Sequence, residues 1–576
     1  MLRNAIFVVA ALIMAALHSP QATAQGATQF SSVQDLPVGE LRKSIERLNP
    51  STRTEAIRQL NQLAPPRADL EVLRASPGGH LFYVDPPAPP ARKSEDTPPK
   101  AGTRIINVNP AFAFALHSKP GAPRVVYLNF RGENVSGTQW NVESGRATHP
   151  MKAYSEDANL AAFSQAEVNT IAEVWNRIAE DFAPFNIDVT TQRPAAFGPN
   201  VGHILFSNRI DKNGFPIYAH PAGGVAFVNV WGRSDFKNLQ PALVFPEGVS
   251  GAKNLTEAAS HELGHNLGLS HDGKGGASYY AGHGTGNVSW APIMGVGYSV
   301  NVSQWSKGEY PGATQTQDDI AIITSKLTLR PDDHGHFSTT ATPLALNNNG
   351  LVTSHTPVTA PGSPALKVNR GVLSTRADVD MFAFTVSSAG TVDLTVTPAW
   401  RDAFNSSSPR SANLDVRAAL LRDNGTLGGA LVTMINPVND TFARVQANVT
   451  PGRYLLRIEG VGAGTLATGY SDYGSLGQYF ISGKVPLPLL RTLTVSTPIA
   501  ARGTVGGGGS FPTGTMQTVT ATAKPGFRFL NWTKGGVQVA TTRVYSFLMN
   551  ANTSLVANFA LGAAAPARLS FNAPEE

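Results

Sequence analysis

The sequence predicts a multidomain protein in which an α/β domain is followed by all-β modules, and three observations lead to that prediction. The chain has 576 residues, which at about 150 residues per domain corresponds to three or four domains. Strand-like and long helix-like segments alternate between residues 124 and 329, whereas period-two alternation between turns dominates beyond residue 329. Apolar residues make up 42% of the chain and charged residues 15%, so several cores can form and a disordered chain is excluded.

The N-terminus has the pattern of a secretory signal peptide, which we place at residues 1–24. Arg3 precedes a short apolar run, and Ala22 and Ala24 supply the small residues of a cleavage site. The run is shorter than the roughly 20 apolar residues that a membrane anchor needs, so we expect a secreted protein without a transmembrane segment. The chain contains no cysteine, which excludes disulfides and thiolate ligands and, in a long secreted chain, indicates a bacterial protein.

Residues 25–119 are predicted to form a pro-region. Helix-like spacing is found at residues 39–48 and 52–63, and residues 81–84 have the pattern of a strand. Residues 85–99 are rich in proline and charge, which is typical of an exposed linker or a processing site.

Residues 120–330 are predicted to form the α/β domain. Strands are expected at residues 125–130, 187–191, 203–206 and 224–231. Ser164 and Glu167 have the spacing of a capping box, followed by a helix with a regular apolar stripe that ends near Phe182. The net charge of +6 is spread along the chain without a run of like charges, so a nucleic-acid partner is not expected.

The strongest chemical signal begins with a predicted helix. Asn254, with Glu257 three residues later, is expected to start this helix, which continues through about Leu267. On such a helix His261 and His265 lie one turn apart on the same face, so both imidazoles can reach one metal ion.

Two further features complete a catalytic metal site. Gly268 can take the positive φ that ends the helix, and the chain can then bring His271 back as a third ligand. Three imidazoles suit Zn²⁺, which in catalytic sites keeps a fourth position for water. Glu262 points away from His261 around the helix and can accept a proton from that water as general base. This arrangement fits peptide-bond hydrolysis.

The motif His261-Glu262-x-x-His265-x-x-Gly268-x-x-His271 resembles that of the metzincin zinc metallopeptidases. Residues 291–295 (Ala-Pro-Ile-Met-Gly) resemble the Met-turn of that clan, which places Met294 beneath the zinc. Asp272, directly after the third histidine, is similar to the reprolysin or adamalysin branch, in which this carboxylate supports the site. The resemblance implies a catalytic domain with a mixed twisted sheet and long helices.

The resemblance also implies a substrate groove. An edge strand at residues 223–231 would pair with an added substrate strand through Gly224, Val225 and Ala226, although an interior strand is the alternative reading. Tyr298 is a candidate substrate contact, and the alternative is an aromatic residue in the pocket wall.

Because the chain has no cysteine, the predicted pro-region cannot keep such a peptidase inactive through a thiolate bound to the metal. Steric covering of the groove by residues 25–119 is the simpler hypothesis. Asp85 is a second candidate, because its carboxylate could cap the zinc.

Two C-terminal modules complete the chain. Residues 331–487 resemble the bacterial pre-peptidase C-terminal domain, a β-sandwich, through segments such as residues 377–382 and 451–460. Residues 488–562 resemble a divergent internalin-type B-repeat, and residues 563–576 are a tail. These β-modules are candidates for binding a cell surface or an extracellular polymer.

The sequence therefore predicts a secreted bacterial zinc endopeptidase, made as a zymogen, that cleaves proteins or peptides. One catalytic Zn²⁺ ion is expected, and a structural Ca²⁺ ion is compatible with the sequence without being indicated by it. The alternative function is a secreted adhesive or substrate-binding protein with a catalytically silent zinc domain.

Overall fold

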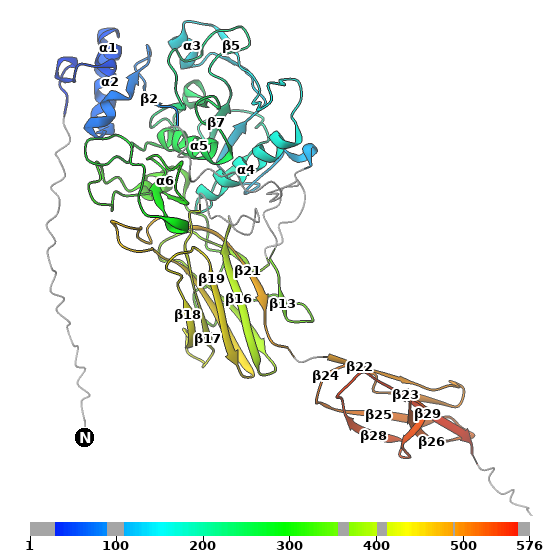
Figure 1. Cartoon of the computed structure of the whole chain (residues 1–576). Coiled ribbons are helices and arrows are strands. Elements are labelled where there is room, and N and C mark those ends of the chain that lie inside the picture. The colour runs from blue at the N-terminus through cyan, green and yellow to red at the C-terminus, as the bar shows by residue number, and fades with distance from the viewer. Residues whose placement is uncertain (1–28, 89–108, 355–367, 400–411, 488–489, 563–576) are drawn as a thin grey trace, which may run out of the picture.

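The structure is a computed structural model that describes residues 29–88, 109–354, 368–399, 412–487 and 490–562 (Figure 1). The predicted signal peptide, residues 89–99 of the predicted linker and the predicted tail lie outside the described residues. Within the described ranges, no helix combines the length and apolar character needed to cross a membrane.

Strands make up most of the regular structure, arranged in several sheets. Six α-helices are found in the described ranges: α1 (Glu40–Glu46), α2 (Pro50–Leu63), α3 (Gln139–Ser144), α4 (Gln165–Asp181), α5 (Ala252–Leu267) and α6 (Asp319–Leu327). All except α1 and α2 lie between residues 139 and 327, where the sequence predicted an α/β domain.

A seven-stranded mixed sheet is the centre of this domain. Its strands are β1 (Leu73–Ala75), β2 (Leu81–Asp85), β3 (Val125–Asn129), β6 (Asp188–Thr190), β7 (Val201–Phe206), β8 (Gly224–Phe227) and β9 (Ala242–Val244). Their order is β1-β2-β8-β9-β7-β3-β6. Strands β6, β3, β7 and β9 are parallel, whereas β8 is antiparallel to both β9 and β2. Two strands of the sheet thus come from the predicted pro-region.

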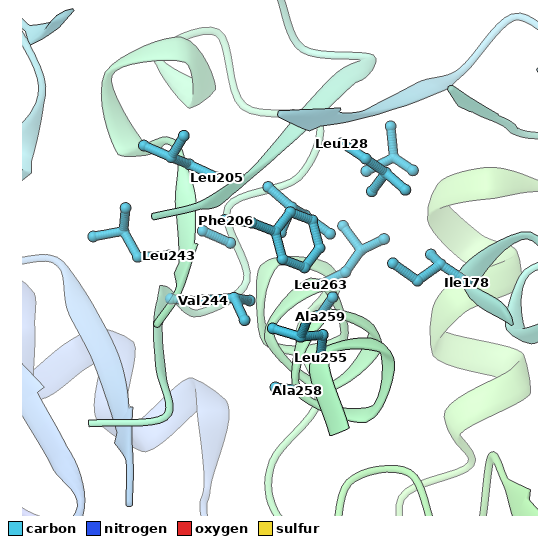
Figure 2. Packing of buried hydrophobic residues seen from close by; sticks show 14 of the residues in the cluster. Leu128, Ile178, Leu205, Phe206, Leu243, Val244, Leu255, Ala258, Ala259 and Leu263 are labelled. Carbon is cyan, nitrogen blue, oxygen red and sulfur yellow. The ribbon is translucent and has the colours of Figure 1, made fainter. Parts of the chain in front are cut away.

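Helix α5 is the most deeply buried helix of the domain and packs between the sheet and helix α4. Figure 2 shows Leu255, Ala259 and Leu263 of α5 beside Phe206 and Val244 of the sheet, and these residues belong to one buried cluster. Every residue from Leu255 to Leu267 is buried, so polar side chains of α5 must find partners inside the protein.

The N-termini of the two long helices differ in how well the sequence predicted them. Ser164 caps α4 as expected, because its hydroxyl accepts the N–H of Glu167 in a capping box. Helix α5 starts earlier than predicted, at Ala252 with Gly251 as the N-cap residue. The expected capping pair is not formed, since the carboxylate of Glu257 instead accepts a hydrogen bond from Ser303.

The predicted strand at residues 224–231 ends at Phe227. Beyond it, Asn229 takes a positive φ of 55°, and its N–H donates to the carbonyl of His265 at 2.8 Å. The N–H groups of Val230 and Trp231 donate to the carbonyl of Asn266. The last turn of a helix has carbonyl groups without partners inside the helix. Residues 229–231 donate N–H groups to two of these carbonyls in α5, and they therefore do not continue strand β8.

The predicted pro-region has its own core but joins the domain at both ends. Residues from 30 to 83 form a buried cluster that also includes Val228. Farther along, Ala113 and Leu116 belong to the main cluster, and the N–H of Ser118 donates to the carbonyl of Val189. Residues 113–119, predicted to be part of the pro-region, therefore pack into the α/β core.

Two short two-stranded sheets flank the α/β domain: β4 (Asn134–Ser136) with β5 (Thr148–Pro150), and β10 (Trp290–Pro292) with β11 (Val302–Gln304).

The next module is a β-sandwich. One sheet has the order β12-β15-β20-β17-β18, and the other contains β13-β21-β16-β19 with β14 paired to β21. Their inner faces form one buried cluster, as the alternating sequence predicted. The strands are β12 (Thr342–Pro343), β13 (Leu351–Val352), β14 (Arg370–Leu373), β15 (Val379–Val386), β16 (Gly390–Pro398), β17 (Val416–Arg422), β18 (Ala430–Ile435), β19 (Ala443–Val449), β20 (Gly452–Gly460) and β21 (Gly477–Lys484).

Residues 490–562 form a smaller module with sheets β24-β22-β29-β26-β27 and β23-β25-β28 around a core that includes Trp532 and Phe559. Its strands are β22 (Leu490–Ser496), β23 (Gly503–Gly506), β24 (Gly509–Pro512), β25 (Met516–Ala523), β26 (Phe527–Lys534), β27 (Val537–Ala540), β28 (Val544–Leu548) and β29 (Thr553–Leu561).

The sandwich is joined to the α/β domain by buried hydrogen bonds. The side-chain amide of Asn413 donates to Asp181 at 2.9 Å and to the carbonyl of Ser303 at 3.1 Å. The carboxylate of Glu180 accepts the backbone N–H of Gln478 at 2.7 Å. Because Asp181 also accepts the hydroxyl of Ser260 on α5, the sandwich reaches the helix that carries the candidate metal ligands.

Candidate metal centre

The three predicted histidine ligands come together at the end of α5. His261 and His265 lie one turn apart on the helix, which stops at Gly268 with a φ of 113°. The N–H groups of Gly268 and Leu269 both donate to the carbonyl of Gly264. This tight turn returns the chain, and the Nε2 atoms of His265 and His271 are 3.1 Å apart.

A fourth side chain, Asp85 at the end of β2, lies among these histidines. Its Oδ1 is 3.0 Å from Nε2 of His271, and its Oδ2 is 3.4 Å from Nε2 of His265 and 3.5 Å from Nε2 of His261. All four side chains are buried, and one potential ligand atom from each lies within 4.8 Å of all the others.

The far nitrogens of the rings fix their orientation. Nδ1 of His261 donates to the carbonyl of Ile293 at 2.9 Å, and Nδ1 of His265 donates to the carbonyl of Leu269 at 2.8 Å. Nδ1 of His271 lies 3.3 Å from the carboxylate of Asp69. Protons on the Nδ1 atoms leave the Nε2 lone pairs free to bind a metal, as is usual for histidine ligands.

Two observations indicate that these residues fit a metal ion. Among the described residues, Nε2 of His261 and Oδ2 of Asp85 are buried without a hydrogen-bond partner, although buried polar atoms are normally paired. Imidazole nitrogens and one carboxylate oxygen are also the ligand types that zinc prefers. His261, His265, His271 and Asp85 would therefore hold such an ion.

The electrostatics of the group reflect its burial. Burial lowers the pKa of His261 to about 3. For His271 burial acts in the same direction, but Asp69 and Asp85 outweigh it and raise the pKa to about 10. Burial alone would raise the pKa of Asp85, yet the neighbouring His261 and His271 lower it well below its usual value. Among the three imidazoles, His271 is the one whose pKa the neighbouring carboxylates raise above its usual value.

Glu262, the predicted general base, lies beside this group on the side of strand β8. A Cβ atom at Gly224 would come within 2.6 Å of the carboxyl carbon of Glu262, so only glycine at this position leaves room for the carboxylate. Burial first, and then the charge of Asp85, raise the pKa of Glu262. Its Oε2 makes no hydrogen bond within the described part of the chain.

Met294 and Asp272 lie where they can support the site. Met294 is fully buried and packs under α5 at Gly264, where a Cβ atom would meet its sulfur. The N–H of Asp272 donates to the carbonyl of Met294 at 2.8 Å, and its carboxylate accepts a hydrogen bond from Gln315. Asp272 thus ties the segment after His271 to the segment around Met294.

The residues predicted to bind substrate lie in a strand whose free edge is covered. Gly224, Val225 and Ala226 of β8 pair with Asp85, Val84 and Tyr83 of β2, respectively, so β8 is an interior strand in this chain. Strand β8 would be an edge strand, as predicted, only if β2 were removed from the sheet. Tyr298 packs against the main core, and burial together with the carboxylates of Asp85, Glu257 and Glu262 raises its pKa.

Three contacts of the site were not predicted from the sequence. The ring of Tyr83 stacks on that of His265 with centroids 4.2 Å apart. The hydroxyl of Tyr279 donates to Asp85 at 2.6 Å, and Asp69 accepts the N–H of His271 at 3.1 Å. No local pattern marks Tyr83, Tyr279 or Asp69 as site residues, because each acts only through a neighbour that is remote in sequence.

Two further groups of potential ligands lie at the start of the sandwich. They consist of Asp332, His336 and Asp378, and of Asp333, His334 and Asp380. One carboxylate oxygen of Asp378 and one of Asp380 are buried without a partner among the described residues. Each group includes a histidine nitrogen, whereas Ca²⁺ takes oxygen ligands, so neither group matches the structural Ca²⁺ ion with which the sequence is compatible.

One comparison with known families matches the C-terminal part of the chain. A family model described as "Divergent InlB B-repeat domain" matches residues 493–563, which confirms the resemblance predicted for this segment. No curated protein sequence matches the chain.

Three solved structures resemble parts of the chain. The pre-peptidase C-terminal domain of a collagenase from Bacillus anthracis is 17% identical, with 27% of this chain and 98% of that chain covered and a TM-score of 0.15. A protein from Sulfurospirillum deleyianum is 9% identical, covering 20% and 95%, with a TM-score of 0.13. A cross-linked bacterial adhesin from Mobiluncus mulieris is 11% identical, covering 34% and 99%, with a TM-score of 0.13. At these scores none of the three bears on the activity of this chain.

Proposed function

We propose that this chain is a secreted bacterial zinc endopeptidase of the metzincin type, made with an N-terminal pro-region. The observation that carries the proposal is the position of Glu262, whose carboxyl group lies against Gly224 and interacts with Asp85, the side chain that lies among the imidazoles of His261, His265 and His271. A metal site that serves only structure has no chemical need for a buried carboxylate with an unpaired oxygen next to it.

The chemistry needs a base, an acid and an oriented substrate. His261, His265 and His271 would hold a zinc ion, which would supply Lewis acidity that polarises a carbonyl group and lowers the pKa of water so that it more readily becomes a nucleophile. The carboxylate of Glu262 takes the proton of that attacking water and returns it to the nitrogen of the departing amine. The backbone of β8 offers hydrogen bonds to an extended peptide laid beside it, which orients the scissile bond.

Proteolysis by the full chain tests this proposal. A recognition site for a specific protease, placed within residues 89–108, allows the predicted pro-region to be cut off on demand. After the cut and removal of the fragment, the zinc-loaded wild type should cleave a denatured protein, and a chelator should stop it.

Two variants complete the test. Glu262→Gln should lose cleavage by about 10²–10⁴-fold, the usual range for a missing general base, while still binding zinc. Glu173→Gln is the matched control, since Glu173 pairs with Arg177 on α4 and should cleave like wild type. Absence of chelator-sensitive cleavage by a zinc-loaded wild type would rule out the peptidase.

The second candidate is an adhesive or substrate-binding protein in which the zinc domain is silent. It is favoured by the fourth carboxylate, because four protein ligands are typical of closed structural zinc sites, and by the B-repeat match at residues 493–563. In that case the β-modules would bind a cell surface or an extracellular polymer, and removal of residues 25–88 would release no proteolysis.

A further inference from the structure

We propose that the C-terminal module, residues 490–562, binds an acidic polysaccharide through a group of cations at one of its ends and the hydroxyl-lined sheet face beside it. The observation behind this inference is a one-sided charge, because the module contains six basic side chains and no Asp or Glu. The basic residues are Arg491, Arg502, Lys524, Arg528, Lys534 and Arg543. This surface is separate from the candidate metal centre, so the inference goes beyond the proposed function and does not depend on it.

The net positive charge of the chain belongs to this module. The whole protein has a net charge of +6, which the six unbalanced cations of residues 490–562 account for, so the excess is not spread along the chain as the sequence suggested. Because the module holds no carboxylate, none of its cations can form an ion pair within it. Cations that no neighbouring acid neutralises create a positive potential that attracts polyanions.

Three of the cations meet at one end of the module. Arg502 lies directly before β23 and Lys524 directly after β25, and these two strands pair antiparallel. The N–H of Lys524 donates to the carbonyl of Arg502 at 3.0 Å. The guanidinium of Arg502 lies over the ring of Phe527, 5.8 Å from its centroid, and Arg528 is the next residue of β26. The three cations therefore lie where β23 and β26 begin and β25 ends (Figure 1).

Arg543 lies at the same end, whereas the two remaining cations do not. Arg543 directly precedes β28, and its carbonyl accepts the N–H of Ala521, near the end of β25, at 3.0 Å. Lys534 is the last residue of β26. Arg491 lies near the start of β22, which is beside the start of β29, and it is the end of β29 that pairs with the start of β26. We define the basic end as Arg502, Lys524, Arg528 and Arg543.

The cations of the basic end are accessible, and hydroxyl groups line the sheet face beside them. Arg502 is half-buried and the other three are exposed. In β25, Val519 and Ala521 are buried in the core, so the alternate residues face outward. The exposed hydroxyl residues of β23, β25 and β28 are Thr504, Thr518, Thr520, Thr522 and Ser546.

These hydroxyl groups lie close together on neighbouring strands. Thr504 pairs with Thr522, and Ser546 pairs with Thr518. Hydroxyl groups can both donate and accept hydrogen bonds, and cations pair with acid groups. A polymer that carries sugar hydroxyls together with carboxylate or sulfate groups matches both parts of this surface.

The aromatic side chains of the module favour a polysaccharide over a single-stranded nucleic acid. Proteins that bind single strands stack the bases on accessible aromatic rings. In this module Trp532 and Phe559 are buried, and Phe511, Phe529, Tyr545 and Phe547 pack against the same cluster. Phe527 lies under the guanidinium of Arg502. The accessible side chains are therefore cations and hydroxyls.

Binding of the full chain to alginate, a polymer of uronate sugars, tests the proposal, with dextran as the uncharged polymer. The wild type should be retained by immobilised alginate and not by dextran. The affinity for alginate should fall at least about tenfold between about 50 and 200 mM salt, because bound cations release counterions from a polyanion. These measurements need no variant.

Two double variants locate the site. Lys524→Gln/Arg543→Gln removes two cations of the basic end and should weaken alginate binding at least about tenfold at low salt. Arg491→Gln/Lys534→Gln is the matched control, since it removes the same charge from the same module outside the basic end, and it should change binding less than about threefold. Equal losses in the two variants overturn the basic end as the site.

A third variant tests the hydroxyl face. Thr520→Val/Thr522→Val keeps the charge and the β-branched shape, and it should weaken alginate binding by about threefold or more, since it removes hydrogen-bonding groups. Wild-type affinity in this variant overturns the role of that face.

The other outcomes are also decisive. Equal retention on dextran and alginate overturns the role of charge. Tighter binding to duplex DNA or to phosphatidylglycerol vesicles than to alginate, compared at equal concentrations of negative charge, overturns the polysaccharide as partner. A protein that binds alginate and cleaves nothing contradicts the peptidase proposal and supports this one.

Discussion

The carboxylate of Glu262 lies directly over Gly224, where a Cβ atom would come within 2.6 Å of the carboxyl carbon. The proposed general base and the strand proposed to bind substrate are therefore in contact, and the lack of a side chain at Gly224 leaves the space that Glu262 occupies.

Gly224→Ala should displace Glu262 and leave the histidines in place. We expect peptidase activity of the freed protein to fall toward that of a variant without the base, by about 10²-fold or more, with zinc affinity unchanged. Steady-state kinetics and a zinc titration measure the two effects. Gly198→Ala is the control, because a Cβ atom there meets no other atom within 4 Å. Full activity of Gly224→Ala would show that this contact does not position the base.

Gly268→Ala should destabilise the turn that brings His271 to the site. The φ of 113° at Gly268 is one that an L side chain rarely adopts, and the strain costs roughly 1–2 kcal/mol. We expect a lower midpoint of denaturation and weaker zinc binding together. Gly276→Ala lies in the following loop, where a Cβ atom meets open space, and should change neither. If Gly268→Ala matches wild type in both measurements, the turn does not depend on this glycine.

Asp69→Asn should weaken zinc binding only while the N-terminal segment is attached. Asp69 lies 3.3 Å from Nδ1 of His271 and accepts its backbone N–H, and losing such a partner of a ligand typically costs 10–100-fold in metal affinity. Competition with a chelator before and after removal of the segment measures this. Asp69 lies within the removed segment, so after removal the variant and the wild type have the same sequence. A difference in zinc affinity that persists would therefore have a cause other than Asp69.

Removal of the segment should also speed the hydrogen exchange of two amides. The N–H groups of Gly223 and Val228 donate to carbonyls of β2 and should lose protection once β2 has gone. The N–H of Ser207, which donates to Val244 inside the domain, serves as the reference. Unchanged exchange at Gly223 and Val228 in the freed protein would mean that something else covers β8.

Glu180 should make the attachment of the sandwich sensitive to pH. Burial raises the pKa of Glu180 to about 7 despite its hydrogen bonds from Gln478 and the charges of Arg330 and Arg370. Because the folded pKa lies above the unfolded value of 4.5, the stabilisation is complete below pH 4.5 and is lost as pH rises through 7, by about 3 kcal/mol in total.

Thermal unfolding from pH 4.5 to 8 measures this effect. The decline with pH should be shallower in Glu180→Gln than in wild type, since glutamine does not titrate. Parallel curves for the two proteins would show that Glu180 does not titrate in this range.

Local patterns predicted the geometry of α5 around its histidines. The spacing of His261, His265 and Gly268 follows from helix geometry, and the structure has the helix ending at that glycine. The start of α5 was predicted wrongly, because Glu257 found a tertiary partner in Ser303 rather than a capping role. Strand β8 was predicted too long, since the carbonyls at the end of α5 recruit the backbone of Asn229 to Trp231.

The covered state of the site could be only partly predicted. Asp85 was one of two hypotheses for latency, and nothing in its neighbourhood sequence ranked it above steric covering. Its contact with His271 joins residues 186 positions apart, and the contact depends on the register of β2 against β8. Asp69 and Tyr279 depend on the same long-range packing, which single-sequence periodicity does not encode.

The hydrogen bonds of Asn413 limit how far the chain can be shortened from its C-terminus. Asn413 donates to Asp181, which in turn holds Ser260 immediately before His261. If the chain were cut between the α/β domain and the sandwich, Asp181 would lose its hydrogen bond from Asn413. Its carboxylate would then either stay buried without that partner or become exposed to water behind the candidate metal ligands. We therefore expect a chain shortened from its C-terminus to keep the arrangement of α5 only if it retains the sandwich through residue 487.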